Sequence, residues 1–260
     1  MKILKFSKSR NYILVVIALI LIPNIYGFYR VFEYTHIFKA RELDVAIVQP
    51  NINPWRKWET SVPQQIQIHK HLQDSLRKSN PYIDLALWCE TSIPYMSIET
   101  NAFHDYPDIR NWVDTSNIAL LTGFTELKLF DDEKTATPTA RKLGASNLMY
   151  ESYNTALLLS PNIQNENRQI YKKMRLTPLA ERLPYADYLL FARGWFEWSV
   201  GISAWGIGKE QKNLKLYQKN DSISIATIIC IESIYPDFVR NFANQGAELF
   251  TVITNDAWYD

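Results

Sequence analysis

The sequence predicts a layered α/β domain preceded by one membrane-spanning helix. From residue 44 onward, short apolar stretches of strand length alternate with stretches of helical periodicity, an order that favours an α/β fold over a helical bundle or an all-β sandwich. Before this region, residues 11–29 form an apolar run in which tyrosine is the only ionisable residue type. We therefore expect a basic cytoplasmic segment at 1–10, a transmembrane helix at 11–29, a linker at 30–43 and an α/β domain at 44–260.

The transmembrane prediction depends on length and charge. At 1.5 Å per residue, a helix over residues 11–29 is about 28 Å long, close to the hydrocarbon thickness of a bilayer. Basic residues before it predict a cytoplasmic amino terminus and a domain on the outer face of the membrane. These residues are Lys2, Lys5, Lys8 and Arg10. The main alternative is a cleaved signal peptide, but the run ends in IYGFYR, which lacks the small residues of a cleavage site.

The first half of the domain contains four stretches that we expect to be strands, because each is a short apolar run. They are DVAIVQ (44–49), LALWC (85–89), IALLTGF (118–124) and YNTALLLS (153–160). Helical periodicity separates the first two at residues 63–78. The polar segment 131–146, which contains proline and glycine, is predicted to be an excursion loop between the last two.

The second half begins with IYKKM (170–174) and a region rich in aromatic residues at 185–205. A strand is expected at SISIATIIC (222–230) and another at LFTVITN (249–255). Between them, a helix is predicted over residues 236–245, because proline is favoured in the first helical turn and glycine after the last one.

The sequence stops at Asp260, shortly after the last expected strand. A sheet that ends there would expose an unpaired edge or a hydrophobic face, which natural proteins usually avoid. We therefore expect the domain to be incomplete at its carboxyl end and the chain to be a fragment of a longer protein.

Composition narrows the classes of function. A chain of 260 residues that is 47% hydrophobic and 21% charged can bury one substantial core. Its 28 basic and 27 acidic residues leave no charge excess that would bind nucleic acid. The sequence has no P-loop and no glycine fingerprint for a dinucleotide, and its four histidines lack metal-ligand spacing. We expect no cofactor, no metal site and no nucleic-acid partner.

The two cysteines are the remaining candidates for a nucleophile, and each lies beside a glutamate. Cys230 ends an expected strand before a turn and a helix, where backbone N–H groups stabilise a thiolate or an oxyanion. Cys89 and Glu90 are neighbours on another expected strand, so their side chains point to opposite faces of the sheet. If Glu90 faces a site, Cys89 packs into a core. Two alternatives remain open, an inert Cys230 in a core and a disulfide between the cysteines.

Three of these stretches resemble the catalytic motifs of the nitrilase, or carbon-nitrogen hydrolase, superfamily, and most closely those of its apolipoprotein N-acyltransferase family. They are LWCETSIPY around Glu90, YKKMRLTPLAERLP at residues 171–184 and IICIESIYP around Cys230. VAIVQPNI, YNTALL and ITNDAW also look like strands of that family, in the same order. Two departures are Leu179-Ala180, where the family has Phe-Gly, and Ile231, where it commonly has tyrosine.

The resemblance implies a nitrilase-like α-β-β-α sandwich with a Glu-Lys-Cys triad. Cys230 aligns with the nucleophile, Glu90 with the general base and Lys173, rather than Lys172, with the catalytic lysine. The supporting positions are Glu181, a second essential glutamate, Glu232, the acidic residue just past the cysteine, and Asn154 in the YNTALL strand. Glu181 and Glu232 are expected to orient the lysine or to handle later proton transfers.

The resemblance also implies an activity. A phospholipid would donate an acyl chain to the cysteine, and the N-terminal amine of a diacylglyceryl-cysteine lipoprotein would accept it at the outer face of the bacterial inner membrane. The aromatic region 185–205 is expected to dip into lipid or to pack in the core. The alternatives are a membrane-tethered amidase or nitrilase that transfers the acyl group to water, and a catalytically inactive fragment.

Overall fold

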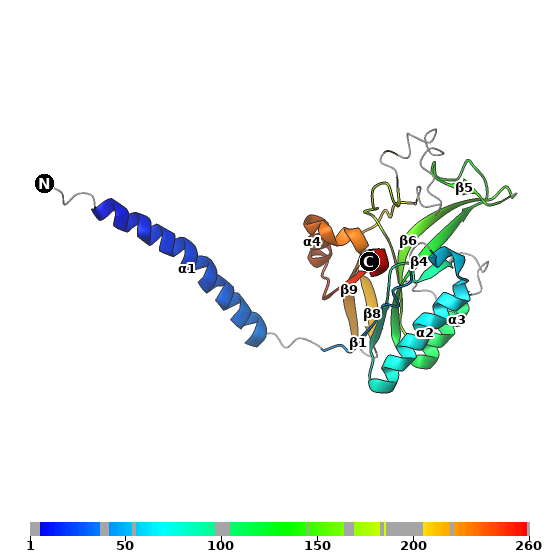
Figure 1. Ribbon diagram of the computed structural model, residues 1–260, viewed down its shortest axis with the longest axis horizontal. Coiled ribbons are helices and arrows are strands. Elements are labelled where there is room, and N and C mark those ends of the chain that lie inside the picture. Colours follow the sequence, from blue (N-terminus) through cyan, green and yellow to red (C-terminus); the bar gives the residue numbers. More distant parts are fainter. Residues whose placement is uncertain are drawn as a thin grey trace. The chain divides into compact units, whose positions relative to one another are not determined.

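A computed structural model describes most of the chain: residues 6–36, 42–53, 56–96, 105–144, 146–163, 169–182, 185, 205–218 and 221–258. The chain divides into two compact units, Met1–Glu42 and Leu43–Asp260 (Figure 1). Of the aromatic region 185–205, the described residues include only Tyr185 and Trp205, so the expectation for that region falls outside them.

The first unit contains one long helix, α1 (Phe6–His36). Its stretch Arg10–Thr35 has a mean hydropathy of 2.1, so it is long and apolar enough to cross a membrane. The helix extends into the segment that we expected to be a linker at 30–43. Arg30 there pairs with Glu33 at 2.6 Å, a spacing of three residues that supports helix, so the charge at Arg30 does not end it.

The larger sheet belongs to the second unit and contains seven strands. Strands β1, β2 and β4 run parallel, as expected where helices connect them, and β6 pairs antiparallel with both β4 and β7. In spatial order the main strands are β1 (Val45–Val48), β2 (Leu85–Trp88), β4 (Ala119–Phe130), β6 (Met149–Leu159) and β5 (Arg141–Lys142). Two further strands lie off this path: β3 (Ile93–Met96) pairs with β4, and β7 (Gln169–Lys172) pairs with β6.

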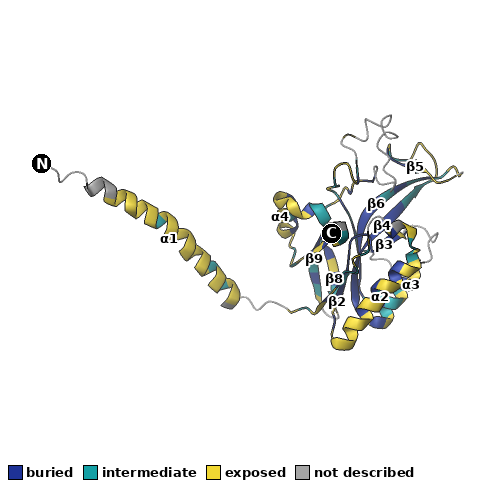
Figure 2. Ribbon diagram, in the orientation of Figure 1, coloured by how far each residue is buried: buried dark blue, intermediate teal, exposed yellow. Residues whose placement is uncertain are grey.

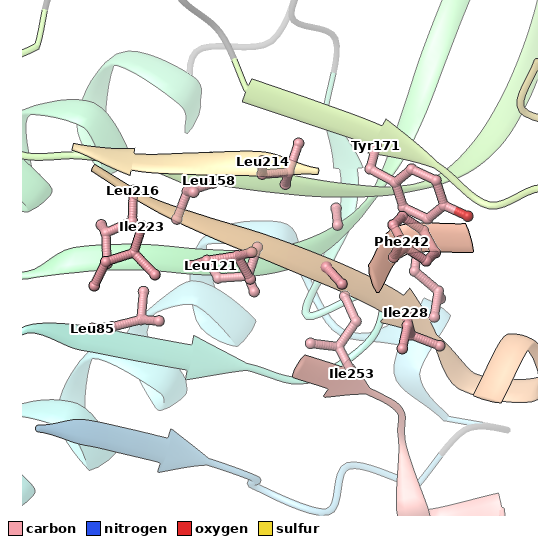
Figure 3. Close-up of a cluster of buried hydrophobic side chains, with 14 of the residues drawn as sticks. Leu85, Leu121, Leu158, Tyr171, Leu214, Leu216, Ile223, Ile228, Phe242 and Ile253 are labelled. Atoms are coloured by element: carbon pink, nitrogen blue, oxygen red, sulfur yellow. The ribbon is translucent and has the colours of Figure 1, made fainter. Parts of the chain in front are cut away.

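Two helices, α2 (Val62–Ser79) and α3 (Asp105–Ser116), cover one face of this sheet (Figures 1 and 2). A smaller sheet of β10 (Leu249–Ile253), β9 (Asp221–Ile229) and β8 (Leu214–Gln218) packs against the other face. Leu121 and Leu158 from the large sheet meet Leu214 and Ile228 from the small one in this core (Figure 3). This layering confirms the predicted α/β sandwich.

Alternation along β6 decides which side chains reach the space between the sheets. Leu157 packs in the core beneath the helices, whereas Ala156 and Leu158 pack in the core between the sheets. Because successive side chains of a strand point to opposite faces, Asn154 shares the inter-sheet face and Tyr153 the helix face. By the same rule Lys172, the last residue of β7, points to the helix face, since its neighbour Tyr171 packs between the sheets; Lys173 follows the strand.

The expected strands and helices all occur, with boundaries shifted by a few residues, except that β4 and β6 are longer than predicted. Apart from short 3-10 helices, four of the described elements were not predicted. Strands β3 and β8 are short, β5 lies inside the segment 131–146 that we expected to be a loop, and α3 has the polar sequence DYPDIRNWVDTS. Helix α4 (Pro236–Asn244) was predicted, and its Phe238 and Phe242 extend the core between the sheets.

Candidate active site

Cys230 lies where β9 ends, in a sharp turn. The strand stops at Ile229, and Cys230 begins a short 3-10 helix, η4 (Cys230–Ile234). Its φ of +50° is in the left-handed region, which costs a residue with a side chain about 1–3 kcal/mol. The predicted α-helix starts only at Pro236, so the turn that carries the thiol is a separate element. Ser233 Oγ donates a hydrogen bond to the Cys230 carbonyl at 2.8 Å.

Glu90 lies in a turn and not on a strand, which corrects the sequence prediction. Strand β2 ends at Trp88, and Cys89 and Glu90 follow it, so strand alternation does not set their directions. Cys89 is nevertheless buried, with its Sγ 3.5 Å from His69 Nε2. Both cysteines are free thiols, so the structure contains no disulfide between them.

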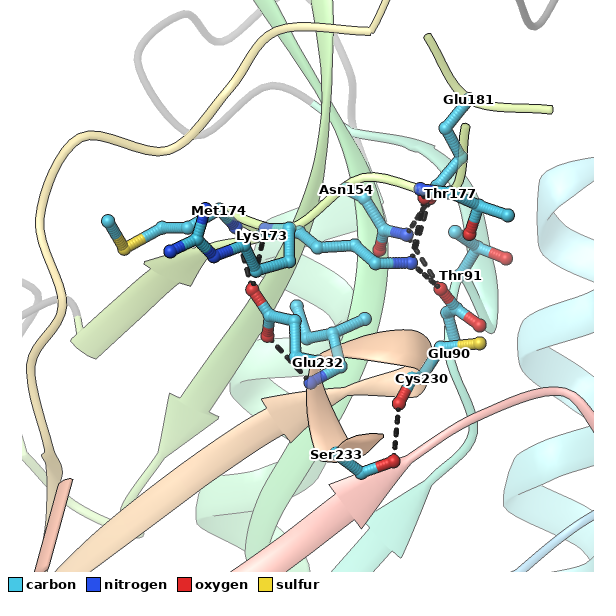
Figure 4. A network of polar contacts seen from close by, with 12 residues as sticks. Glu90, Thr91, Asn154, Lys173, Met174, Thr177, Glu181, Cys230, Glu232 and Ser233 are labelled. Atoms are coloured by element: carbon cyan, nitrogen blue, oxygen red, sulfur yellow. Dashed lines mark hydrogen bonds and ion pairs between the residues drawn. The ribbon is translucent and has the colours of Figure 1, made fainter. Parts of the chain in front are cut away.

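Three charged side chains from distant parts of the chain form a buried cluster (Figure 4). Lys173 is 1% exposed, and its Nζ lies 3.0 Å from Glu90 Oε1 and 2.9 Å from Glu181 Oε2. Burial alone would lower the pKa of Lys173, but the carboxylates of Glu90 and Glu181 outweigh it and raise that pKa above its ordinary value. The lysine is therefore a fixed ammonium between two carboxylates.

Asn154 ties this cluster together. Its side-chain Nδ2 donates to Glu90 Oε1 at 2.7 Å and to Glu181 Oε1 at 2.8 Å. Its backbone carbonyl accepts a hydrogen bond from the backbone N–H of Lys173 at 2.8 Å. Thr177 N–H donates to the other oxygen of Glu181 at 2.7 Å. Each carboxylate thus receives donors from more than one element, which limits the rotamers that it can adopt.

The Cys230 side chain lies close enough to this cluster to be affected by its charges (Figure 4). Burial and the negative charge of Glu90 raise the pKa of Cys230, while Lys173 and a hydrogen bond with Thr254 act in the opposite direction. The thiol is therefore protonated at neutral pH. A nucleophilic role then requires a nearby base, and Glu90 is a carboxylate in position to be one.

Glu232 is fully buried, and its hydrogen bonds in the described residues go to the cysteine turn and to the segment around Lys173, not to the Lys173 ammonium itself. Its carboxylate accepts hydrogen bonds from the backbone N–H groups of Ile229 at 2.9 Å, Met174 at 2.7 Å and Arg175 at 3.1 Å, and from the Tyr171 hydroxyl at 2.8 Å. Burial raises the pKa of Glu232, and these hydrogen bonds offset part of that rise. Glu232 thereby joins the cysteine turn to the segment that follows Lys173.

Lys172 faces away from the cluster. Its Nζ lies 3.1 Å from Glu126 Oε2 and 4.3 Å from the centre of the Tyr153 ring, on the helix face of the sheet. The structure therefore brings Glu90, Asn154, Lys173, Glu181 and Cys230 together, and leaves Lys172 outside.

Two residues at this site carried no signal in the sequence. Lys57, in the short helix η1 (Lys57–Glu59), is 3% exposed and donates from Nζ to the Glu90 carbonyl at 3.2 Å and to Thr91 Oγ1 at 2.6 Å. Gly123 lies directly against the same turn: a Cβ there would be 2.6 Å from Thr91 N and 2.7 Å from Glu90 Cα. A side chain at position 123 would displace the turn.

Chemically, the site combines a thiol, a carboxylate and a buried ammonium, which could serve as nucleophile, base and oxyanion partner in acyl transfer through a thioester. Within the described ranges, no group of three histidine, cysteine, aspartate or glutamate residues is arranged to hold a metal ion.

Known proteins are similar to this chain in sequence and in fold. The carbon-nitrogen hydrolase family model matches residues 44–260. The chain is 33% identical to the apolipoprotein N-acyltransferase of Chlorobaculum tepidum, over 98% of the chain and 47% of that protein. It is 29% identical to apolipoprotein N-acyltransferase 1 of Treponema denticola, over 88% of the chain and 42% of that protein. The chain thus spans about half the length of the curated relatives it matches.

Among solved structures, Nit3 of Saccharomyces cerevisiae, a member of branch 10 of the nitrilase superfamily, has a TM-score of 0.55 at 14% identity. The match covers 83% of this chain and 67% of that one. At this identity the likeness concerns the fold alone, and it shows that the sandwich is nitrilase-like.

Proposed function

Because the chain belongs to the carbon-nitrogen hydrolase family, we propose that it is an N-acyltransferase that modifies lipoproteins. It transfers a fatty acyl chain from a membrane phospholipid, through a thioester on Cys230, to the N-terminal amine of a diacylglyceryl-cysteine lipoprotein. The observation that carries this proposal is the contact of Lys173 with both Glu90 and Glu181 beside Cys230. The names of the relatives from Chlorobaculum tepidum and Treponema denticola support the choice of substrates.

In the first step, Glu90 takes the proton of the Cys230 thiol as the sulfur attacks the ester carbonyl of the phospholipid. Lys173 stabilises the oxyanion that forms, because a buried ammonium is already oriented before the reaction. The carbon–oxygen bond then breaks, and the lysophospholipid alkoxide takes the proton from Glu90. The enzyme is left as a thioester, with Glu90 again ionised.

In the second step, the lipoprotein amine attacks the thioester carbonyl and Glu90 takes a proton from the amine. The carbon–sulfur bond breaks, an amide forms, and the departing sulfur recovers the proton. Glu181 and Asn154 hold Lys173 and Glu90 in place during both steps. Glu232 fixes the segment after Lys173 through its backbone hydrogen bonds.

Membrane attachment fits substrates that are lipids. We place α1 across the bacterial inner membrane, with the basic residues at the amino-terminal end of the chain in the cytoplasm and the catalytic domain of residues 44–260 on the periplasmic face. On that face both the phospholipid donor and the lipoprotein acceptor are accessible without crossing the bilayer.

The test is acylation of the protein in phospholipid vesicles, followed by intact mass spectrometry. An acyl adduct should form, should be absent in Cys230→Ala, should persist in Cys89→Ala, and should disappear when a diacylglyceryl-cysteine peptide is added. An adduct that water removes without any amine would instead indicate a hydrolase. Acylation of Cys89, or no adduct on folded protein, would refute the proposal.

A further inference from the structure

Lys57 is an unusual residue to find in a protein interior, because lysine is rarely buried without a carboxylate partner. It is 3% exposed, and the ion pairs among the described residues do not include it. Its two hydrogen bonds go to the backbone carbonyl of Glu90 and to the hydroxyl of the next residue, Thr91. All the hydrogen bonds of its ammonium in the described structure therefore converge on one turn.

That turn needs support. Thr91 has a φ of +48°, a conformation that a β-branched residue adopts only when its surroundings enforce it. The backbone of the turn is held on other sides by Glu90 N–H donating to the Thr254 carbonyl at 3.4 Å and by Gly123 N–H donating to the Cys89 carbonyl at 3.3 Å. Lys57 supplies the contact from the side of α2, where Gln65 Nε2 in turn donates to the Lys57 carbonyl at 2.5 Å.

We propose that Lys57 is a positioning residue: it holds the Glu90–Thr91 turn so that the Glu90 carboxylate meets Lys173 and Cys230. This inference rests on the proposed function, in which Glu90 is the general base. The Lys57 ammonium donates to the backbone carbonyl of Glu90 and to the hydroxyl of Thr91, so it acts through the base and not on the reacting atoms.

Lys57 is the positively charged group on the side of the turn that faces α2. The titratable groups that face the turn and its neighbours are Lys57 from η1, His69 from α2, Cys89, Lys173 after β7, Cys230 after β9, and Asp256 in η5 (Asp256–Trp258). Burial lowers the pKa of His69 to about 4, so that ring is neutral at neutral pH. Burial also lowers the pKa of Lys57, while Cys89 and Glu90 act in the opposite direction.

The test measures two reactions of Cys230 by intact mass spectrometry, acylation by p-nitrophenyl butyrate and alkylation by iodoacetamide, with Cys230→Ala as the blank. Lys57→Met keeps the length of the side chain but removes the charge and both hydrogen bonds. We expect acylation on the order of tenfold to a hundredfold slower, because the base is displaced, while alkylation, which does not need the base, should not slow. Thr91→Val removes only one of the two hydrogen bonds, so it should slow acylation less.

Lys172→Met is the matched control, because it also removes a lysine from a partly buried ion pair but on the opposite face of the sheet. It should lower thermal stability and keep both rates near those of the wild type. The proposal is overturned if Lys57→Met retains the wild-type rate of acylation, if it slows acylation and alkylation equally, or if Lys172→Met slows acylation as much. If Lys57→Met does not fold, Thr91→Val decides, and a wild-type rate for that variant overturns the proposal.

The ester assay also separates this inference from the proposed function. Wild-type protein that reacts with the ester but not with phospholipid vesicles counts against the lipid substrate, while the comparison of Lys57, Thr91 and Lys172 variants keeps its meaning.

Discussion

The Nζ atom of Lys173 lies 3.0 Å from Oε1 of Glu90, although the two residues are 83 positions apart in the sequence. Because Glu181 contacts the same ammonium, the three groups carry one net negative charge when all are ionised. Loss of the Cys230 proton to solvent would add a second negative charge to this buried site. Transfer of that proton to Glu90 leaves the total charge unchanged, which favours Glu90 as its acceptor.

The two adjacent lysines provide a direct test of this arrangement. Lys173→Met should slow acylation of Cys230 about a hundredfold or more, because the oxyanion loses its cation. It should also destabilise the fold by about 3–5 kcal/mol, because two buried carboxylates lose their partner. Lys172→Met should lose stability through Glu126 and keep acylation near the wild-type rate. Rates come from intact mass spectrometry and stabilities from denaturant unfolding; equal acylation by both variants would contradict the prediction.

Glu90→Gln should affect two reactions of Cys230 in opposite directions. Since the charge of Glu90 raises the pKa of Cys230, its removal lowers that pKa, and alkylation by iodoacetamide at neutral pH should become faster. Acylation by an ester should become about a hundredfold slower or more, because the base is lost.

Glu181→Gln is the control for Glu90→Gln. Glu181 is the other carboxylate that contacts Lys173, and its charge raises the pKa of Cys230 less than the charge of Glu90 does. Glu181→Gln should therefore change the rate of alkylation less than Glu90→Gln, and Glu90 remains available as the base. If alkylation and acylation both slow down in Glu90→Gln, the base assignment is wrong.

Local patterns were sufficient for most of the fold, because the buried strands are short apolar runs that contrast with their surroundings. Strand β9 and helix α2 are examples, and the order of such elements indicated the layers. Helix α3 was not predicted because few of its residues are apolar, and β8 was not predicted because five residues show little periodicity.

The site was predictable only in part. Motif resemblance pointed to Glu90, Lys173 and Cys230. It did not reveal that Glu90 follows the strand in a turn whose next residue, Thr91, has a left-handed φ. Lys57 could not be found, because nothing local distinguishes a buried lysine from the exposed lysines that are the rule. Its role depends on a contact with residues more than thirty positions away.

Glu232→Gln tests the link between the cysteine turn and the lysine segment. The carboxylate accepts three backbone N–H groups and one hydroxyl, whereas an amide presents an NH₂ group to at least one of those donors. We expect a loss of about 1–3 kcal/mol in the free energy of unfolding and slower acylation as Lys173 shifts.

The control for Glu232→Gln is Glu248→Gln, since Glu248 accepts the backbone N–H of Ser224 at 2.8 Å at an exposed position. That variant should change stability by no more than about 0.5 kcal/mol. Equal unfolding midpoints for the two variants would show that the hydrogen bonds of Glu232 do not hold the site together.

His69 should make the protein sensitive to mild acid. Its ordinary pKa is 6.5, and burial lowers it to about 4 in the folded state, where Nδ1 lies 2.8 Å from the Gln65 carbonyl. Between these values the unfolded chain binds a proton that the folded protein does not, so stability falls as the pH drops from 6.5 towards 4. The full effect is about 3 kcal/mol, at 1.36 kcal/mol per pKa unit.

Denaturant unfolding over this pH window measures the effect, and the exposed His71 provides the control. His69→Gln should lower stability at neutral pH, because two buried contacts change, and should flatten the pH dependence relative to wild type. His71→Gln should keep the wild-type slope, since this variant leaves the buried His69 in place. Parallel curves for wild type and His69→Gln would mean that His69 takes up a proton equally in both states, which its burial on the inner face of α2, beside Cys89, makes energetically unfavourable.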